Sequence, residues 1–328
     1  MKRSRIQAVR GTRDFYPEAM AFRLWLYGKI RAASERFGYA EYEGPILEPL
    51  ELYAAKSGEE LVKEQAFTLQ DKGGDMLTLR PELTPTLARM VAAKQQALPR
   101  PIRWWSFGPF WRYERPQKGR GREFFQWNLD CLGASALACE AEAIAVAAEF
   151  FKSLGLTPAE VTIKVNSRRL MDAEAAKLGI GPDRKAVCLR LVDRRDKMSP
   201  DKWKAYGAEA GFSPAQVEGL DALMADASLW QKDEELKAVF SLLETLGVRP
   251  FVSYDPSVVR GLDYYTRTVF EGTHADLGAQ DAILGGGRYD GLVESLGGPA
   301  RPAVGFAAGV ERWAGLVAPW GSELPRID

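Results

Sequence analysis

The sequence predicts an α+β fold, in which a mixed and mainly antiparallel sheet is flanked by helices and interrupted by a helical insertion. Short apolar and aromatic runs separated by turn residues occupy residues 1–166 and return from residue 250 onward. Residues 167–249 are instead mostly helical in pattern, charged and poor in strand signals. We therefore expect a discontinuous domain formed by residues 1–166 and 250–328, with a helical insertion domain at 167–249.

Helices are expected outside the insertion where apolar residues recur at helical spacing. The first covers residues 18–38 and ends at Gly38, because glycine suits the backbone conformation just past a helix end. The others are expected at 85–97, 136–154 and, closing the chain, 305–317.

Strands are expected where short runs of β-branched and aromatic residues are bounded by turn residues. The runs 67–70 and 76–79 flank the sequence DKGGD, whose residue types suit a hairpin turn. Residues 39–50 are expected to form a strand broken by Pro45 and Pro49. Four more strands are expected at 161–165, 251–254, 266–272 and 282–287.

The stretch from Phe110 to Gln126, FWRYERPQKGRGREFFQ, is rich in arginine beside aromatic residues. The apolar runs before and after it predict two strands, and residues 116–119 predict the turn between them. Such a hairpin suits a polyphosphate, because guanidinium groups are planar, bidentate and permanently charged donors. Taken alone, the cluster would also fit a solvated basic hairpin.

Composition excludes several classes of protein. The 44 basic and 44 acidic residues cancel, so contact with nucleic acid has to come from a local patch. Three cysteines without CxxC spacing favour reduced thiols in a cytoplasmic protein. We find no apolar run of membrane-spanning length and no hydrophobic signal region, and expect no membrane partner. The single histidine, His274, argues against a histidine triad or metal site and is expected in an exposed loop or at a strand end.

Four further segments place polar side chains within apolar surroundings. Glu82 and Thr84 follow an expected strand in LRPELT. Gln126 and Asp130 share one face of the outgoing hairpin strand, because their spacing is even. The other segments are RGLDYYT at 260–266 and the glycine-rich pair GGGRYD at 285–290 and GFAAGVER at 305–312, where backbone can approach closely. Each segment alone would also fit a purely structural role.

Together these segments resemble the catalytic core of histidyl-tRNA synthetase, a class II aminoacyl-tRNA synthetase. The sequence GTRDFYP at 11–17 is similar to the N-terminal signature of that family, the arginine hairpin resembles class II motif 2, and GFAAGVER resembles motif 3. RGLDYYT and GGRYDG resemble the two histidine-specific motifs. The resemblance runs from residue 7 to residue 328 and implies a cytoplasmic homodimer, joined through the N-terminal helix and strand, that uses L-histidine, ATP with Mg²⁺, and tRNA in protein biosynthesis.

The resemblance also implies a catalytic pair and an ATP-binding set. Arg112 would contact the α-phosphate, and Arg260 would lie between that phosphate and the histidine carboxylate, where positive charge stabilises the transition state. Arg120 and Arg312 would bind the outer phosphates. Phe124 would stack on one face of adenine, and Arg312 would cover the other face. Glu114 would lie near the adenine amino group. No metal ligand from the protein is expected.

In the histidine site, the resemblance assigns acceptor groups to the α-amino group and a carboxylate with a phenol to the imidazole. This combination suits an imidazole, because its two nitrogens need a donor and an acceptor. The α-amino group would be held by Glu82, Thr84 and Gln126. The imidazole would be read by Asp130 and Tyr265 in a pocket lined also by Tyr264 and Tyr289.

Two departures from the family pattern keep an alternative open. Asp130 stands where many bacterial members have glutamate; the charge is kept, but the side chain is shorter, so the resemblance does not fix the exact pocket geometry. The sequence ends at LPRID, a segment that in the family introduces a C-terminal anticodon-binding domain, and we expect that domain to be absent. The sequence would then be either an excised catalytic fragment or a natural paralogue without the domain. Short relatives without it are regulatory, histidine-sensing subunits of ATP phosphoribosyltransferase, which typically lose residues around the arginine of RGLDYYT. Arg260 and the ATP set are present here, so we favour histidine–tRNA ligase.

Overall fold

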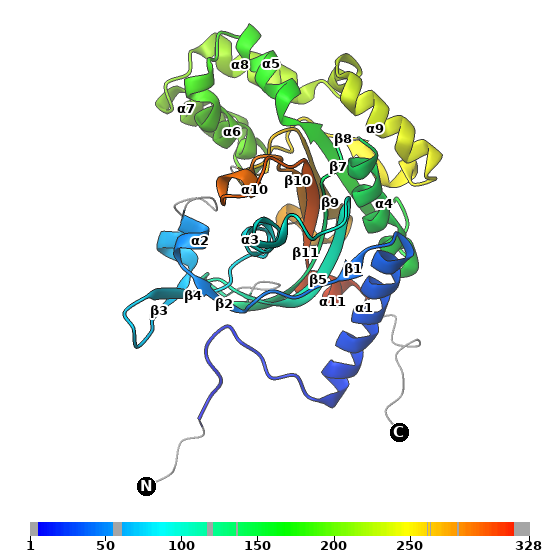
Figure 1. Cartoon of the computed structure of the whole chain (residues 1–328). Helices are drawn as coiled ribbons and strands as arrows, with labels where there is room; N and C mark the ends of the chain where they lie inside the picture. Colours follow the sequence, from blue (N-terminus) through cyan, green and yellow to red (C-terminus); the bar gives the residue numbers. More distant parts are fainter. Residues whose placement is uncertain are drawn as a thin grey trace.

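The computed structural model describes residues 6–54, 61–116, 121–135, 137–260, 262, 264–280 and 282–317. Within it, an eight-stranded sheet forms the centre, in the order β1-β5-β6-β11-β10-β9-β7-β8 (Figure 1). Its strands are β1 (Ala40–Glu41), β5 (Ile102–Trp111), β6 (Glu123–Leu132), β7 (Val161–Ser167), β8 (Val252–Tyr254), β9 (Thr268–His274), β10 (Ala282–Arg288) and β11 (Ala303–Gly309).

The six inner strands, β5-β6-β11-β10-β9-β7, pair antiparallel with their neighbours. At the two edges of the sheet, β1 pairs parallel with β5, and β8 pairs parallel with β7. The expected mixed, mainly antiparallel sheet is therefore confirmed. A separate small sheet has the order β2-β4-β3. It consists of β2 (Leu47–Pro49), β3 (Phe67–Gln70) and β4 (Met76–Leu79). The region 39–50 thus contributes one short strand to each sheet, on either side of Pro45.

Helices cover the two faces of the large sheet differently (Figure 1). On one face, α1 (Pro17–Arg36) and α4 (Ala138–Ser153) bury apolar side chains against the sheet, with Leu26 and Trp127 inaccessible to solvent. On the other face lie α3 (Thr84–Lys94) and the short α10 (Leu292–Ser295), which bury Leu87 and Val293. Residues at the start of α3 also line the cavity of the candidate site.

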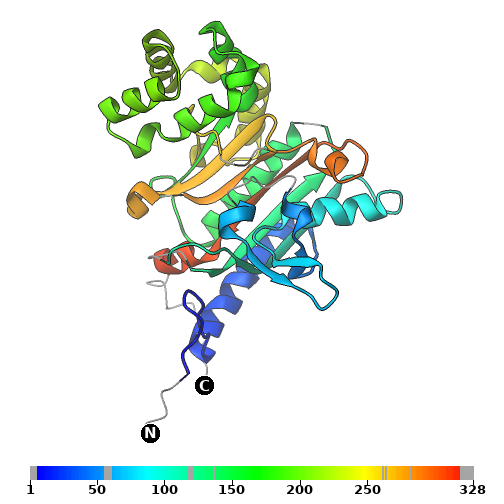
Figure 2. The ribbon, with the colours of Figure 1, turned by 90° about the vertical axis from the view of Figure 1, so that its left-hand side faces the viewer.

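The insertion lies at the top of the molecule in both views (Figures 1 and 2). Its helices α5 (Arg168–Lys177), α6 (Lys185–Asp193), α7 (Pro200–Glu209) and α8 (Pro214–Ala225) enclose an apolar cluster of their own around Leu191, Trp203 and Leu220. The following α9 (Glu234–Thr245) packs against α4 and buries Phe240 in the main core instead. The domain division at 167–249 remains a proposal, and the separate helical cluster α5–α8 supports its first part.

One expectation from the sequence is wrong, and a second is confirmed only in part. Residues 303–309 form β11, and only α11 (Val310–Val317) is helical, whereas a helix was expected from residue 305. The stretch lies between β6 and β10, where a Cβ atom on Gly305 would overlap the Asp130 carboxylate. His274 does lie at a strand end, but it is buried and its Nδ1 accepts a hydrogen bond from the Asp276 amide at 3.1 Å. In both cases the packing of neighbouring elements, rather than the local sequence pattern, decides the outcome: the strand conformation of residues 303–309 and the burial of His274.

No helix among the described residues combines the length and the apolar character needed to cross a lipid bilayer.

Candidate active site

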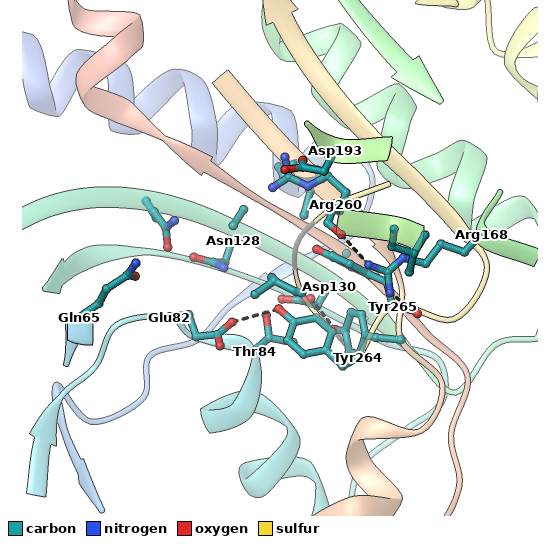
Figure 3. A pocket seen from close by; sticks show the side chains of 18 of the residues that line it. Gln65, Glu82, Thr84, Asn128, Asp130, Arg168, Asp193, Arg260, Tyr264 and Tyr265 are labelled. Carbon is teal, nitrogen blue, oxygen red and sulfur yellow. Dashed lines mark hydrogen bonds between the residues drawn. The ribbon is translucent and has the colours of Figure 1, made fainter. Parts of the chain in front are cut away.

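A cavity of about 620 Å³ opens between the large sheet and the insertion (Figure 3). Its floor comes from β6, β10 and β11, and its walls come from the start of α3, the loop before β9, and α6 of the insertion. The structure brings into this cavity every residue expected to bind histidine: Glu82, Thr84, Gln126, Asp130, Tyr264, Tyr265 and Tyr289.

Asp130 lines the cavity and is 2% exposed. Its Oδ1 accepts a hydrogen bond from the Tyr289 hydroxyl at 2.5 Å, and its Oδ2 has no hydrogen-bond partner among the described residues. Burial raises the pKa of Asp130 to about 7, although the Tyr289 hydrogen bond opposes this shift. The carboxyl group therefore combines an anchored oxygen with a second, buried oxygen whose hydrogen-bonding capacity is unused among the described residues.

Glu82 is also buried, immediately before α3. The Tyr264 hydroxyl donates a hydrogen bond to its Oε2 at 3.0 Å (Figure 3). The rings of Tyr264 and Tyr265 lie 5.0 Å apart, edge to face. Burial raises the pKa of both tyrosines, that of Tyr265 to about 12, so both phenols remain neutral donors near pH 7.

A second cavity of about 230 Å³ adjoins the first. It is lined by Arg112, Glu114, Phe124 and Arg312 together with residues of β10 and β11. The Arg112 guanidinium carbon lies 5.3 Å from the centre of the Phe124 ring. Of the residues expected to bind ATP, only Arg120 lies outside the described residues.

The two cavities share part of their lining, including Arg112, Gln126, Arg260 and Gly285. They therefore form one cleft with the two arginines at the junction. Arg260 forms an ion pair with Glu271, and its guanidinium occupies the space where a Cβ atom on Gly285 would lie. A glycine in β10 thus lets the guanidinium lie directly on the sheet.

Sequence reasoning missed several residues that line the larger cavity: Gln65, Asn128, Arg168 and Asp193 (Figure 3). The even spacing that pairs Gln126 with Asp130 could have found Asn128, which lies between them on the same strand face. Arg168 and Asp193 belong to the insertion, and no local motif connects them with the sheet. Among the described residues, no group of three or more His, Cys, Asp or Glu side chains is placed to hold a metal ion.

The antiparallel sheet, the arginine-bearing strand hairpin and the glycine-rich strands under a two-part cleft define a class II aminoacyl-tRNA synthetase core. Solved structures agree with this fold. The structure of histidyl-tRNA synthetase from Nostoc sp. PCC 7120 has a TM-score of 0.82 at 23% identity, over 97% of this chain and 77% of that one. A Bacillus halodurans C protein described as an ATP phosphoribosyltransferase regulatory subunit/histidyl-tRNA synthetase has a TM-score of 0.81 at 23% identity, over 97% and 84%.

Sequence comparisons identify the family. The family model described as histidyl-tRNA synthetase matches residues 11–313. A histidine–tRNA ligase of Haloarcula marismortui is 40% identical over 92% of this chain and 72% of that protein. The chloroplastic/mitochondrial histidine–tRNA ligase of Arabidopsis thaliana is 38% identical over 94% and 65%. This chain belongs to the histidyl-tRNA synthetase family.

Proposed function

We propose that the chain is the catalytic core of a histidine–tRNA ligase. It activates L-histidine with ATP to histidyl-adenylate and pyrophosphate, and then transfers histidine to the 3′ end of its tRNA. The observation that carries this proposal is the junction of the two cavities at Arg112 and Arg260. A site for an amino acid and a site for a nucleotide meet there, as the first step requires.

In the first step, an oxygen of the histidine carboxylate attacks the α-phosphorus of ATP. A new P–O bond forms, the bond to the oxygen that bridges to the β-phosphate breaks, and pyrophosphate leaves. Two anions must approach each other, so positioning and positive charge supply most of the rate enhancement. We assign that charge to Arg112 and Arg260 at the junction. One such donor contributes roughly 3 to 4 kcal/mol to transition-state stabilisation.

The second cavity suits ATP. We assign Phe124 to stacking on adenine, Arg312 to the other face of adenine, and Glu114 to the adenine amino group. All three side chains line this cavity. The outer phosphates are assigned to Arg312 and Arg120. Mg²⁺ is proposed to enter with ATP, because nucleotide-bound Mg²⁺ is held largely by phosphate oxygens and waters. Its role is to neutralise phosphate charge.

The first cavity suits histidine. Glu82, Thr84 and Gln126 supply the acceptors for the α-amino group. Asp130 and Tyr265 are assigned to the two imidazole nitrogens. Tyr289 and Tyr264 have an indirect role: the Tyr289 hydroxyl orients the carboxylate of Asp130, and the Tyr264 hydroxyl orients that of Glu82.

The alternative, a regulatory histidine-sensing subunit of ATP phosphoribosyltransferase, is less supported. A sensor needs only the first cavity, whereas this chain keeps Arg112, Glu114, Phe124, Arg260 and Arg312 around the second. The curated relatives described above are named histidine–tRNA ligases. The Bacillus halodurans protein is 23% identical and supports the fold alone.

The test is histidine-dependent exchange of pyrophosphate into ATP in the presence of Mg²⁺. We expect exchange with histidine and none with the other amino acids, because only an imidazole meets both Asp130 and Tyr265. Calorimetric titration of histidine and ATP runs in parallel. Histidine binding without exchange in a well-folded sample would favour the sensor instead.

Three further assignments are proposals that rest on the family. The homodimer would use α1 and β1, and α1 does expose Leu24, which is 60% accessible. The motif 2 loop, residues 115–122, would approach the acceptor end of tRNA. A cytoplasmic location is proposed from the cysteine pattern. Sedimentation, tRNA footprinting and cell fractionation test them in turn.

A further inference from the structure

The backbone of Arg260 takes an uncommon conformation. Its φ is 54°, in the left-handed region that residues with a Cβ atom rarely adopt. The residue lies in the connection between β8 and β9, outside regular structure. A conformation of this kind persists only where surrounding groups hold it. The groups that hold it therefore decide where the Arg260 guanidinium points.

Arg168, the first residue of α5, supplies three of those holding contacts (Figure 3). Its Nε donates to the Val259 carbonyl at 2.9 Å, its Nη2 to the Arg260 carbonyl at 2.6 Å, and its Nη1 to the Tyr265 carbonyl at 2.9 Å. The side chain is 3% exposed, so these are buried contacts. The rigid fork of a guanidinium suits three acceptors that converge from one loop.

The end of β7 adds two contacts to the same loop. Asn166, which is fully buried, donates from Nδ2 to the carbonyls of Pro256 and Val258 at 2.9 and 3.1 Å. Buried carbonyls outside a sheet ladder need such donors, because each unsatisfied group is costly. The side chains of Asn166 and Arg168 therefore both hold the loop that contains Arg260.

We infer that Arg168 is a positioning residue for Arg260 in the activation step, an inference that rests on the function proposed above. Arg168 acts on the backbone that carries Arg260, so its loss lets the catalytic guanidinium leave its place at the cavity junction. Arg168 also begins the first insertion helix, and α6 of the insertion lines the same cavity. The position of the insertion and the position of Arg260 are therefore coupled through the contacts of Arg168.

The test compares Arg168→Met with a matched control, Arg169→Met, in the pyrophosphate exchange assay. Arg169 is the next residue, its side chain is 57% exposed, and it pairs with Glu235 at 3.1 Å. We expect Arg168→Met to lower kcat roughly 10- to 100-fold, the scale of a misplaced catalytic group, and Arg169→Met to leave it unchanged. Arg168→Lys should recover only part of the loss, because one ammonium group cannot reproduce the fork.

The decisive readout is a double-mutant cycle with Arg260→Ala. If Arg168 acts through Arg260, adding Arg168→Met to Arg260→Ala should lower kcat by less than about twofold further. The inference is overturned if Arg168→Met lowers kcat by the same factor in the unsubstituted chain and in Arg260→Ala. It is also overturned if the kcat of Arg168→Met equals that of Arg169→Met.

Thermal melting accompanies each variant. If Arg168→Met does not fold, Arg168→Lys carries the test, and a folded lysine variant with unchanged kcat overturns the inference. Absence of exchange in the unsubstituted chain would overturn the proposed function, and this inference with it.

Discussion

The Tyr289 hydroxyl donates a hydrogen bond to Oδ1 of Asp130 at 2.5 Å, between two side chains that are each 2% exposed. The two residues are 159 positions apart in the sequence: Asp130 lies on β6, and Tyr289 directly follows β10. This contact anchors one carboxylate oxygen and leaves Oδ2 without a partner among the described residues. Burial meanwhile raises the pKa of Asp130 to about 7. With a pKa near 7, the carboxyl group changes its protonation state around neutral pH.

The first prediction concerns the pH dependence of histidine binding. The pKa of Asp130 is about 7, and that of a free imidazole is about 6.5. If the complex holds one proton between the two groups, binding releases a proton at low pH and takes one up at high pH. Affinity should therefore rise with pH to a maximum between about 6.5 and 7 and fall above it. Calorimetric titration from pH 5 to pH 9 measures this profile.

Asp130→Asn is the control for that profile. An amide does not titrate, so the fall in affinity above pH 7 should disappear, histidine binding should weaken at neutral pH, and ATP binding should be largely unchanged. A profile identical to that of the unsubstituted chain would contradict the assignment of Asp130 to the imidazole.

The second prediction concerns stability without ligand. The pKa of Asp130 in the folded chain, about 7, lies above its ordinary value of 3.8, so the folded state retains a proton that the unfolded state has lost. The stability contributed by this group is present below pH 4 and is lost as pH rises to about 7. The change is on the order of 4 kcal/mol as an upper limit. Urea unfolding of the unsubstituted chain and of Asp130→Asn should show this slope only in the former.

The third prediction concerns Arg260. Arg260→Ala should lower the exchange rate by roughly a hundredfold or more, because it removes positive charge at the reacting phosphate. Histidine affinity should change much less. Lysine should rescue poorly, since it lacks the planar fork. Arg169→Ala, on an exposed arginine of α5, is the control for general effects of charge removal. An alanine variant with near-normal turnover would rule out the role.

The fourth prediction concerns Gly305, which faces Asp130 across the β6–β11 pairing. A Cβ atom there would overlap Oδ1 of Asp130 and the Leu129 carbonyl. Gly305→Ala should destabilise the chain by about 1 to 3 kcal/mol and weaken histidine binding, because the carboxylate must move. Gly291→Ala is the matched control, since nothing lies within 4 Å of its Cβ position. Equal melting temperatures and histidine affinities in the two variants would contradict this account.

Much of the site could be predicted from the sequence where the signal is local. The strands Phe67–Gln70 and Met76–Leu79 follow from a turn between two short runs, and the structure has these bounds. The common face of Gln126 and Asp130 follows from the two-residue period of a strand. The segments at 260–266 and 285–290 were singled out by residue type, and both contribute to the cleft.

Only the tertiary structure decided the rest. The run AVGFAAG carries no alternation, because β11 is largely buried between two neighbouring strands, and its sequence cannot distinguish a strand from a helix. The bonds Tyr289–Asp130 and Tyr264–Glu82 join residues more than 150 positions apart, and the three contacts of Arg168 reach carbonyls about 90 positions away. Sequence alone determined the chemical groups of the site and the family, since these depend on residue types in short motifs. The tertiary structure determined which of these groups meet and what holds them, because packing brings distant segments together.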